Sequence, residues 1–190
     1  EMLRSLVGSE MCIRDRDCVI VDPGDEAKRI KKFIEDQELH PVAILLTHGH
    51  FDHVMAVDSV RTAYHIPVYA AEAEKETMQD ASINLSINMG GAMLSVEADH
   101  WLKDGETITL LDQEVRCILT PGHTVGGMCF YFPKAGMLFS GDTLFQESVG
   151  RTDFPGGSMS EIVRSIREKL FVLPDAVQVL SLIHISEPTR

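Results

Sequence analysis

The 190-residue sequence contains no uninterrupted apolar run of about 18 residues, and its amino terminus lacks the charged, then apolar, pattern of a secretion signal. We therefore predict a cytoplasmic protein with no membrane-spanning segment. Cations are also scarce: 17 Lys and Arg stand against 29 Asp and Glu, a formal net charge of −12, and the cations are not clustered. A field of this sign repels phosphate backbones, so we expect no nucleic-acid partner.

Cysteine is too sparse and too irregularly spaced to define a disulfide framework. Cys12, Cys18, Cys117 and Cys129 form no C-x-x-C pair, and most lie in apolar runs, which favours buried reduced thiols over disulfides or a cysteine zinc site. The remaining composition, 44% hydrophobic and 24% charged, is typical of a soluble domain with a proper core and excludes a disordered chain.

The two ends of the chain differ in character from the rest. Residues 6–16 read LVGSEMCIRDR and residues 180–190 read LSLIHISEPTR, and both resemble in-frame translations of a transposase-type sequencing adapter, in the two expected orientations. We therefore predict that residues 17–179 form a single natural domain that is incomplete at both termini, and that residues 1–16 and 180–190 are non-native.

Between these ends, short apolar runs alternate with helical periodicity, which is typical of a layered α/β fold. We predict helices from Asp25 as an N-cap, over 54–64, and over 158–171, where Ser158 and Glu161 form a capping box. The stretch 79–99 has no clear period and is predicted to be a loop-rich insertion or lid. Strands are predicted at 18–21, 42–46, 67–70, 107–110, 114–119, 128–132 and 137–140, with a last one starting at 177–179.

The segment T-H-G-H-F-D-H at 47–53 directly follows a predicted buried strand. Its histidines and aspartate are ligand types suited to zinc or iron. In an extended chain His48 and His50 point the same way and can reach one metal, and a chain reversal can aim Asp52 and His53 at a second site. The alternatives are that Asp52 caps the next helix and that each histidine is an ordinary core or surface residue. The density of ligands favours the metal site.

Two further candidates follow later strands, His123 in T-P-G-H-T and Asp142 in S-G-D. Each alone is a common turn residue. Together they supply what the first segment lacks, because a catalytic zinc takes three protein ligands and a carboxylate can bridge two metals.

Five motifs carry a family resemblance: V-D-P-G at 21–24, H-x-H-x-D-H at 48–53, P-G-H-T at 121–124, S-G-D-T-L-F at 140–145 and G-R-T-D-F-P-G-G at 150–157. Through them the chain resembles metallo-β-lactamase-fold hydrolases of the glyoxalase II, or hydroxyacylglutathione hydrolase, type. The resemblance implies a four-layer αββα sandwich with metals in the cleft between two sheets. It also implies that His48, His50 and His123 bind a first metal, that Asp52 and His53 bind a second, and that Asp142 bridges them.

The activity that this resemblance implies is hydrolysis of a small-molecule thioester such as S-lactoylglutathione by a metal-bound hydroxide, with two zinc ions as cofactor and iron as the other possibility. Asp52 would orient the water, and the thiolate would leave without a protein general acid. Arg151 is a candidate for binding a substrate carboxylate. The alternative is that Arg151 pairs with Asp153 and only holds the loop.

The sequence departs from the family where a Pro-Gly-His-Gly turn normally completes the second metal site. His184 lies near that place without the flanking Pro-Gly, so we do not expect it to be a ligand, and we expect the first site to be the better filled. Two alternatives stay open: a persulfide dioxygenase of the same fold with one iron on His48, His123 and Asp142, and an inactive truncated fragment with unpaired sheet edges. A β-lactamase is disfavoured because Asp142 replaces that class's usual ligand. The sequence leaves the acyl group and the oligomeric state open.

Overall fold

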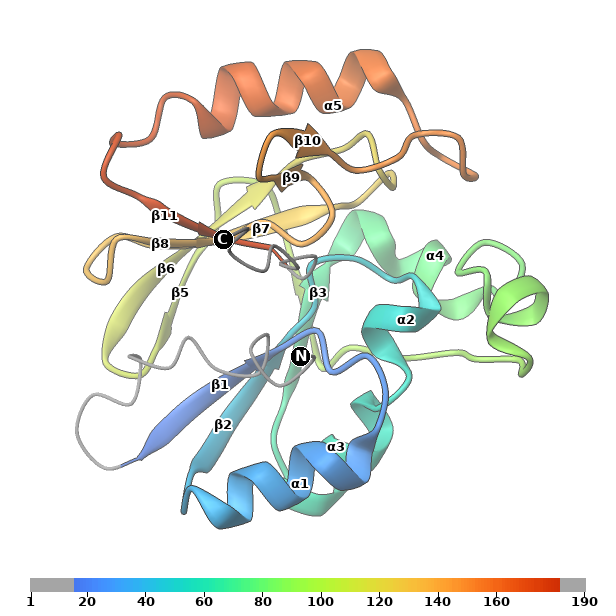
Figure 1. Ribbon diagram of the computed structural model, residues 1–190, viewed down its shortest axis with the longest axis vertical. Coiled ribbons are helices and arrows are strands. Elements are labelled where there is room, and N and C mark those ends of the chain that lie inside the picture. Colours follow the sequence, from blue (N-terminus) through green and yellow to red (C-terminus); the bar gives the residue numbers. More distant parts are fainter. Residues whose placement is uncertain (1–15, 182–190) are drawn as a thin grey trace, which may run out of the picture.

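The computed structural model describes residues 16–181, in which two β-sheets face each other and helices cover their outer sides (Figure 1). The first sheet is parallel throughout, and its strands follow the order of the chain: β1 (Asp17–Val21), β2 (His40–Leu45), β3 (Val68–Ala71) and β4 (His100–Leu102). In the second sheet four antiparallel neighbours are joined by a fifth strand parallel to β8: β5 (Thr107–Leu110), β6 (Gln113–Leu119), β7 (Met128–Phe132), β8 (Met137–Phe139) and β11 (Gln178–Leu180).

The helices lie on opposite outer faces of this pair of sheets (Figure 1). Two pack on the parallel sheet, α1 (Ala27–Asp36) and α3 (Val57–Tyr64), whereas α5 (Met159–Ser165) and the π-helical turn η4 (Ile166–Leu170) pack on the other. Shorter pieces are α2 (Phe51–Val54), the 3-10 helix η2 (Glu72–Glu74), α4 (Lys75–Gln79) and the π-helical turn η3 (Ser86–Gly90). Among the helices of residues 16–181, none has the length and apolarity that a bilayer span requires.

Three apolar interfaces separate four layers. Ile30 and Ile34 of α1 pack with Ile44 of β2, and this cluster closes the outer face of the parallel sheet. A second cluster joins side chains of both sheets, among them Val21, Leu45, Phe130 and Phe132. In the third, Ile162, Ile166 and Leu170 pack on Cys129 and Tyr131 of β7. All five residues of β7 are buried because both of its faces are covered. The predicted αββα sandwich is thus confirmed.

Most predicted strands are confirmed within one or two residues. The strand β4 and the short hairpin of β9 (Leu144–Phe145) and β10 (Ser148–Val149) were not predicted. The prediction for 79–99 holds in part: the segment is largely irregular, but it contains the π-helical turn η3, and Met78 just before it is fully buried in the core.

Two helix predictions are wrong in detail. Asp25 is not the N-cap of α1; that position is Glu26, whose backbone N–H donates to Asp25 Oδ1 at 2.6 Å. The predicted helix over 54–64 is broken into α2 and α3. The backbone N–H of Ala56 donates to the carbonyl of Pro23 at 3.0 Å, so a tertiary contact between the two loops replaces the helical bond. Half of the capping box is confirmed, since Ser158 Oγ accepts from the backbone N–H of Glu161 at 3.4 Å. The other half is wrong, because the backbone N–H of Ser158 donates to the carbonyl of Gly122 at 2.8 Å instead of to the Glu161 side chain.

Most residues of the two ends lie outside the described range 16–181, so few of the predictions about the ends can be compared with the structure. Leu180, predicted as non-native, lies in β11 opposite Phe139 of β8. The rest of the two adapter-like segments, with Cys12 and His184, lies almost wholly outside residues 16–181, so their origin stays a prediction. The three cysteines in the described range, Cys18, Cys117 and Cys129, are buried and no disulfide joins any two of them, as expected.

Candidate metal centre

The site residues follow strand ends that meet along one edge of the sandwich. Asp22 comes directly after β1 and His48 shortly after β2, at carboxyl ends of the parallel sheet. His123 follows β6 and Asp142 follows β8, in loops of the facing sheet. Parallel α/β sheets place polar groups for binding at such ends, because the loops there converge while the strands hold them rigidly.

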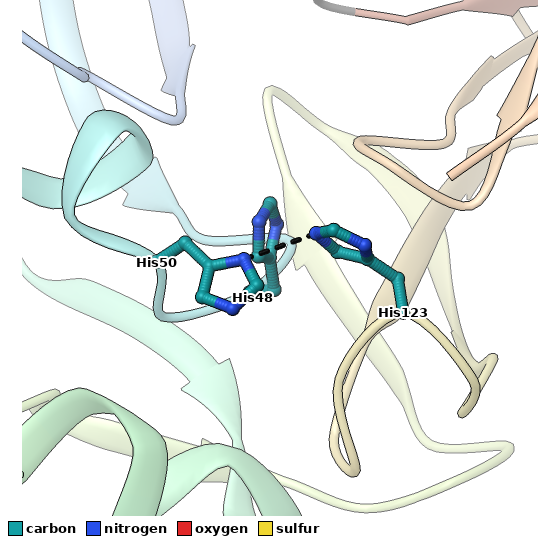
Figure 2. Close-up of side chains that lie close together, drawn as sticks. All are labelled: His48, His50 and His123. Atoms are coloured by element: carbon teal, nitrogen blue, oxygen red, sulfur yellow. Dashed lines mark hydrogen bonds between the residues drawn. The ribbon is translucent and has the colours of Figure 1, made fainter. Parts of the chain in front are cut away.

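Three histidines converge in the first cluster (Figure 2). One nitrogen each of His48, His50 and His123 lies within 4.8 Å of the other two, and Nδ1 of His50 is 3.0 Å from Nε2 of His123. All three residues are buried, with exposed fractions of 2–4%. Residues that are 73 positions apart in the sequence therefore present their ring nitrogens to one point.

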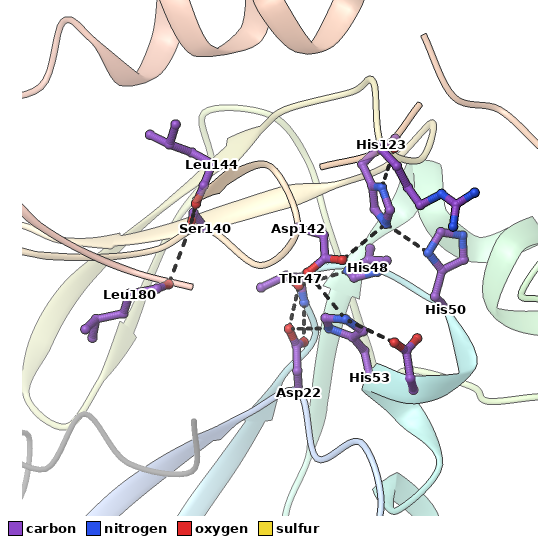
Figure 3. Close-up of polar contacts among 12 residues, drawn as sticks. Asp22, Thr47, His48, His50, His53, His123, Ser140, Asp142, Leu144 and Leu180 are labelled. Atoms are coloured by element: carbon purple, nitrogen blue, oxygen red, sulfur yellow. Dashed lines mark hydrogen bonds and ion pairs between the residues drawn. The ribbon is translucent and has the colours of Figure 1, made fainter. Parts of the chain in front are cut away.

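A second cluster surrounds His53 (Figure 3). Its Nδ1 is 3.1 Å from Oδ2 of Asp22, while its Nε2 is 3.5 Å from Oδ1 of Asp142 and 4.0 Å from Oδ2 of Asp52. The other oxygen of Asp142 is 3.7 Å from Nε2 of His123. Asp142 thus lies between the two clusters with one oxygen toward each. The Asp52 side chain is 62% exposed and lies at the rim.

Burial and mutual repulsion keep His48 and His50 of the first cluster neutral. Burial, followed by repulsion from His123 and His53, lowers the pKa of His50 to about 3, and burial lowers the pKa of His48 well below its usual value. Burial also lowers the pKa of His53, but the hydrogen bond to Asp22 and the nearby carboxylates outweigh it and raise that pKa to about 9. Burial raises the pKa of Asp142. Neutral imidazoles are the form that binds a metal.

The cluster fits a transition metal. Nε2 of His48, Nε2 of His50 and Oδ1 of Asp142 are buried without a hydrogen-bond partner, which is costly in a folded protein unless another group satisfies such atoms. Imidazole nitrogens with a carboxylate suit zinc or iron better than magnesium or calcium. All six predicted ligands are brought together: the four histidines are buried, the Asp142 side chain is 15% exposed, and Asp52 lies at the rim. Metal binding by these residues stays a prediction.

Asp22 is a site residue that the sequence reading missed. Its Oδ1 accepts from the backbone N–H of Thr47 at 2.7 Å, and its Oδ2 accepts from Thr47 Oγ1 at 2.5 Å and faces His53 Nδ1. Because its Oδ2 faces Nδ1 of His53 while Nε2 of the same ring faces Asp142, we interpret Asp22 as the carboxylate that orients His53. The sequence signal that could have identified Asp22 is the D-P-G turn, which directly follows an apolar strand.

Arg151 is engaged within its own loop. Its guanidinium makes two hydrogen bonds to Asp153, at 2.7 and 2.6 Å, and lies 4.0 Å from the centre of the Phe154 ring. The backbone carbonyl of Arg151 accepts from Nδ1 of His123 at 2.7 Å, so the other ring nitrogen, Nε2, is the one that faces His50. The loop-holding alternative is therefore present in the structure, while substrate contact by Arg151 stays a prediction.

Two motif glycines permit the close approach of the site loops. A Cβ on Gly24 would overlap the backbone carbonyl of Asp52, and a Cβ on Gly150 would overlap that of Asp142. Both glycines occur in motifs noted in the sequence, V-D-P-G and G-R-T-D-F-P-G-G. Their role is steric, because they let the backbones of two predicted ligand residues lie against neighbouring loops.

A parallel and a largely antiparallel sheet, with histidines and aspartates gathered at one shared edge, define a metallohydrolase of the αββα type. Residues 10–181 match the family model of the metallo-beta-lactamase superfamily, and the chain belongs to this superfamily. It is 41% identical over 170 residues to the Probable metallo-hydrolase YqgX of Bacillus subtilis (strain 168), a match that covers 89% of this chain and 81% of that protein. It is 31% identical to the Hydroxyacylglutathione hydrolase GloC of Haemophilus influenzae, over 88% of this chain and 80% of GloC.

Solved structures agree with this assignment. The BLEG-1 B3 metallo-beta-lactamase has 40% identity and a TM-score of 0.83, covering 88% of this chain and 81% of its own. TTHA1623, solved in a di-iron-bound form, has 33% identity and a TM-score of 0.75, covering 86% and 80%. The protein is accordingly a metal-dependent hydrolase of the metallo-beta-lactamase superfamily.

Proposed function

We propose that the protein hydrolyses thioesters of the hydroxyacylglutathione type. The observation that carries the proposal is the place of Asp142, with one oxygen toward His123 and the other toward His53, because a carboxylate so placed can serve two metal ions. The similarity to GloC supports the thioester as the substrate class.

We propose two zinc ions as the cofactor, the first held by His48, His50 and His123 and the second by Asp52 and His53, with Asp142 shared. When bound, such ions polarise the carbonyl and lower the pKa of water toward neutrality. Iron is the alternative, and the di-iron form of TTHA1623 supports it. We place the reaction in the cytoplasm, a compartment in which the buried reduced cysteines of the described range stay reduced.

The residues of this chain supply orientation and proton handling. Asp22 holds His53 through Nδ1, and the carbonyl of Arg151 holds His123 through Nδ1, so each ring presents Nε2 to the centre. We propose that Asp52, whose side chain is exposed at the rim, orients the attacking water and takes its proton on a carboxylate oxygen. Water adds to the thioester carbonyl, the C–S bond breaks, and a carboxylic acid and a thiol result. A thiolate is a good leaving group, so no protein acid is needed.

The test is an assay of the purified, zinc-reconstituted protein with S-lactoylglutathione, following release of the free thiol. We expect turnover that is lost on chelation and restored by zinc. A second candidate, β-lactam hydrolysis, is favoured by the similarity to BLEG-1, and a chromogenic cephalosporin tests it in parallel. Turnover of the cephalosporin alone, or oxygen uptake with glutathione persulfide by an iron-loaded sample, would replace the thioesterase assignment.

The substrate contact proposed for Arg151 predicts a specific kinetic effect. In the Arg151→Gln protein we expect KM for S-lactoylglutathione to rise about 10-fold with kcat nearly unchanged, because the lost bond to a substrate carboxylate is made equally in the ground and transition states. Steady-state kinetics measure both constants. A fall in kcat with unchanged KM would show instead that Arg151 acts only by holding the loop that orients His123.

A further inference from the structure

Glu74 is a buried carboxylate that the proposed reaction does not use. It ends the 3-10 helix η2, and its exposed fraction is 1%. Its Oε1 accepts from the backbone N–H of Gly49 at 3.0 Å. Its Oε2 accepts from Thr124 Oγ1 at 3.0 Å and from the backbone N–H of Gly126 at 2.7 Å. The Thr77 hydroxyl is a fourth donor.

Three of these four partners lie in the two loops that carry the first cluster, whereas Thr77 lies in α4. Gly49 stands between His48 and His50, at the end of the parallel sheet. Thr124 and Gly126 follow His123, in the loop between β6 and β7 of the other sheet. One carboxylate therefore ties together loops of opposing sheets, and the positions it joins are 25, 50 and 52 residues from it.

The four donors around Glu74 require that both oxygens of its side chain act as acceptors. Burial raises the pKa of Glu74 to about 7, and the hydrogen bonds to Gly49, Thr124 and Gly126 oppose this rise. An amide in its place could accept on one side only, and its NH2 group would face a donor on the other. The loop that faces the NH2 group would lose its hydrogen bond to residue 74, and the NH2 group would be a buried donor without an acceptor.

We infer that Glu74 is a positioning residue that sets the distance between the two loops and thereby aligns His48 and His50 with His123 for the first metal. It contacts neither the reacting atoms nor, in any bond described above, a predicted ligand side chain. The inference rests on the metal site of the proposed function. It concerns only the first cluster, because Asp22 and Asp142 hold His53 independently.

The decisive variant is Glu74→Gln, with Glu72→Gln as its matched control. Glu72 lies two residues earlier in the same short helix, and its side chain is 60% exposed. The apo-proteins are titrated with zinc against a chromophoric chelator, and amide hydrogen exchange is followed over 47–51 and 121–127. We expect one zinc-binding step of Glu74→Gln to weaken about 10- to 100-fold while the other stays unchanged, the range found for groups that orient metal ligands. We also expect faster exchange in both loops.

The control should match the parent in every measurement. Unchanged zinc affinity and unchanged amide exchange in Glu74→Gln would overturn the inference. Equal weakening of both zinc-binding steps together with a general loss of stability would also overturn it, since these two effects together are typical of a purely structural residue. If Glu74→Gln does not fold, Thr124→Val removes a single donor, and the same changes are expected at smaller size. Amide hydrogen exchange in the apo-protein tests whether Glu74 holds the two loops together, even if the protein binds no zinc or cleaves no thioester. The two proposals can therefore fail separately.

Discussion

The Asp142→Asn protein will cleave the thioester at least about 100-fold more slowly than the parent, yet its apo form will unfold at the same temperature or a higher one. Activity falls because the amide has no charge to share between the two clusters, and loss of even an orienting partner costs about 10- to 100-fold. Stability does not fall because burial raises the pKa of Asp142 in the folded state. A carboxyl with a raised folded pKa destabilises the protein above its unfolded pKa, and the neutral amide removes that cost at pH 7.

Steady-state kinetics, zinc content and thermal unfolding of the metal-free proteins measure these effects together. Asp58→Asn is the matched control, since Asp58 lies on the surface of α3 with a 67% exposed side chain. It should change neither activity nor the unfolding temperature. If the unfolding temperature of apo Asp142→Asn is several degrees below that of the parent, the Asp142 carboxylate stabilises the fold. The idea that this carboxylate costs stability in exchange for metal binding would then be wrong.

Zinc should raise the unfolding temperature of the apo-protein by roughly 5–10 °C. A ligand that binds only the folded state at about 100 times its Kd adds about 2.7 kcal/mol. In a domain of this size each kcal/mol is worth about 2–4 °C. The structural reason is that the ring nitrogens of His48 and His50 and one oxygen of Asp142 are buried without hydrogen-bond partners until a cation satisfies them. Differential scanning fluorimetry over a series of zinc concentrations measures the shift.

Two comparisons make this result specific. Magnesium should give little shift, because it prefers six oxygen ligands over imidazole nitrogen. Asp142→Asn should show a smaller zinc shift than the parent, whereas Asp58→Asn should show the full one. Iron(II), measured without oxygen, compares the two candidate metals by the size of the shift. If zinc, iron(II) and manganese all leave the parent unshifted, the cluster is not a metal centre.

The elements that the sequence predicted well are those whose signal is local. The continuous apolar run over 42–46 indicated a strand buried on both faces, and Ile44 and Leu45 of β2 are buried because α1 covers one face and the second sheet covers the other. The helix predicted over 54–64 is confirmed over 57–64 as α3 but is wrong at its start, because the break before α3 depends on Pro23, a residue more than 30 positions earlier. Periodicity within a helix carries no information about a carbonyl from another loop.

The candidate site also combines features that are local in the sequence with features that depend on tertiary contacts. The sequence by itself determined the set of ligand types, because His48, His50, Asp52 and His53 fall within six residues directly after a strand. Only the tertiary structure decided how these groups are arranged: that Asp142 lies between His123 and His53, that Asp22 orients His53, and that Glu74 joins two loops from opposing sheets. The physical reason is that each of these contacts joins residues that are distant in the sequence. The distance between them is fixed only when the strands assemble into sheets and the two sheets pack against each other.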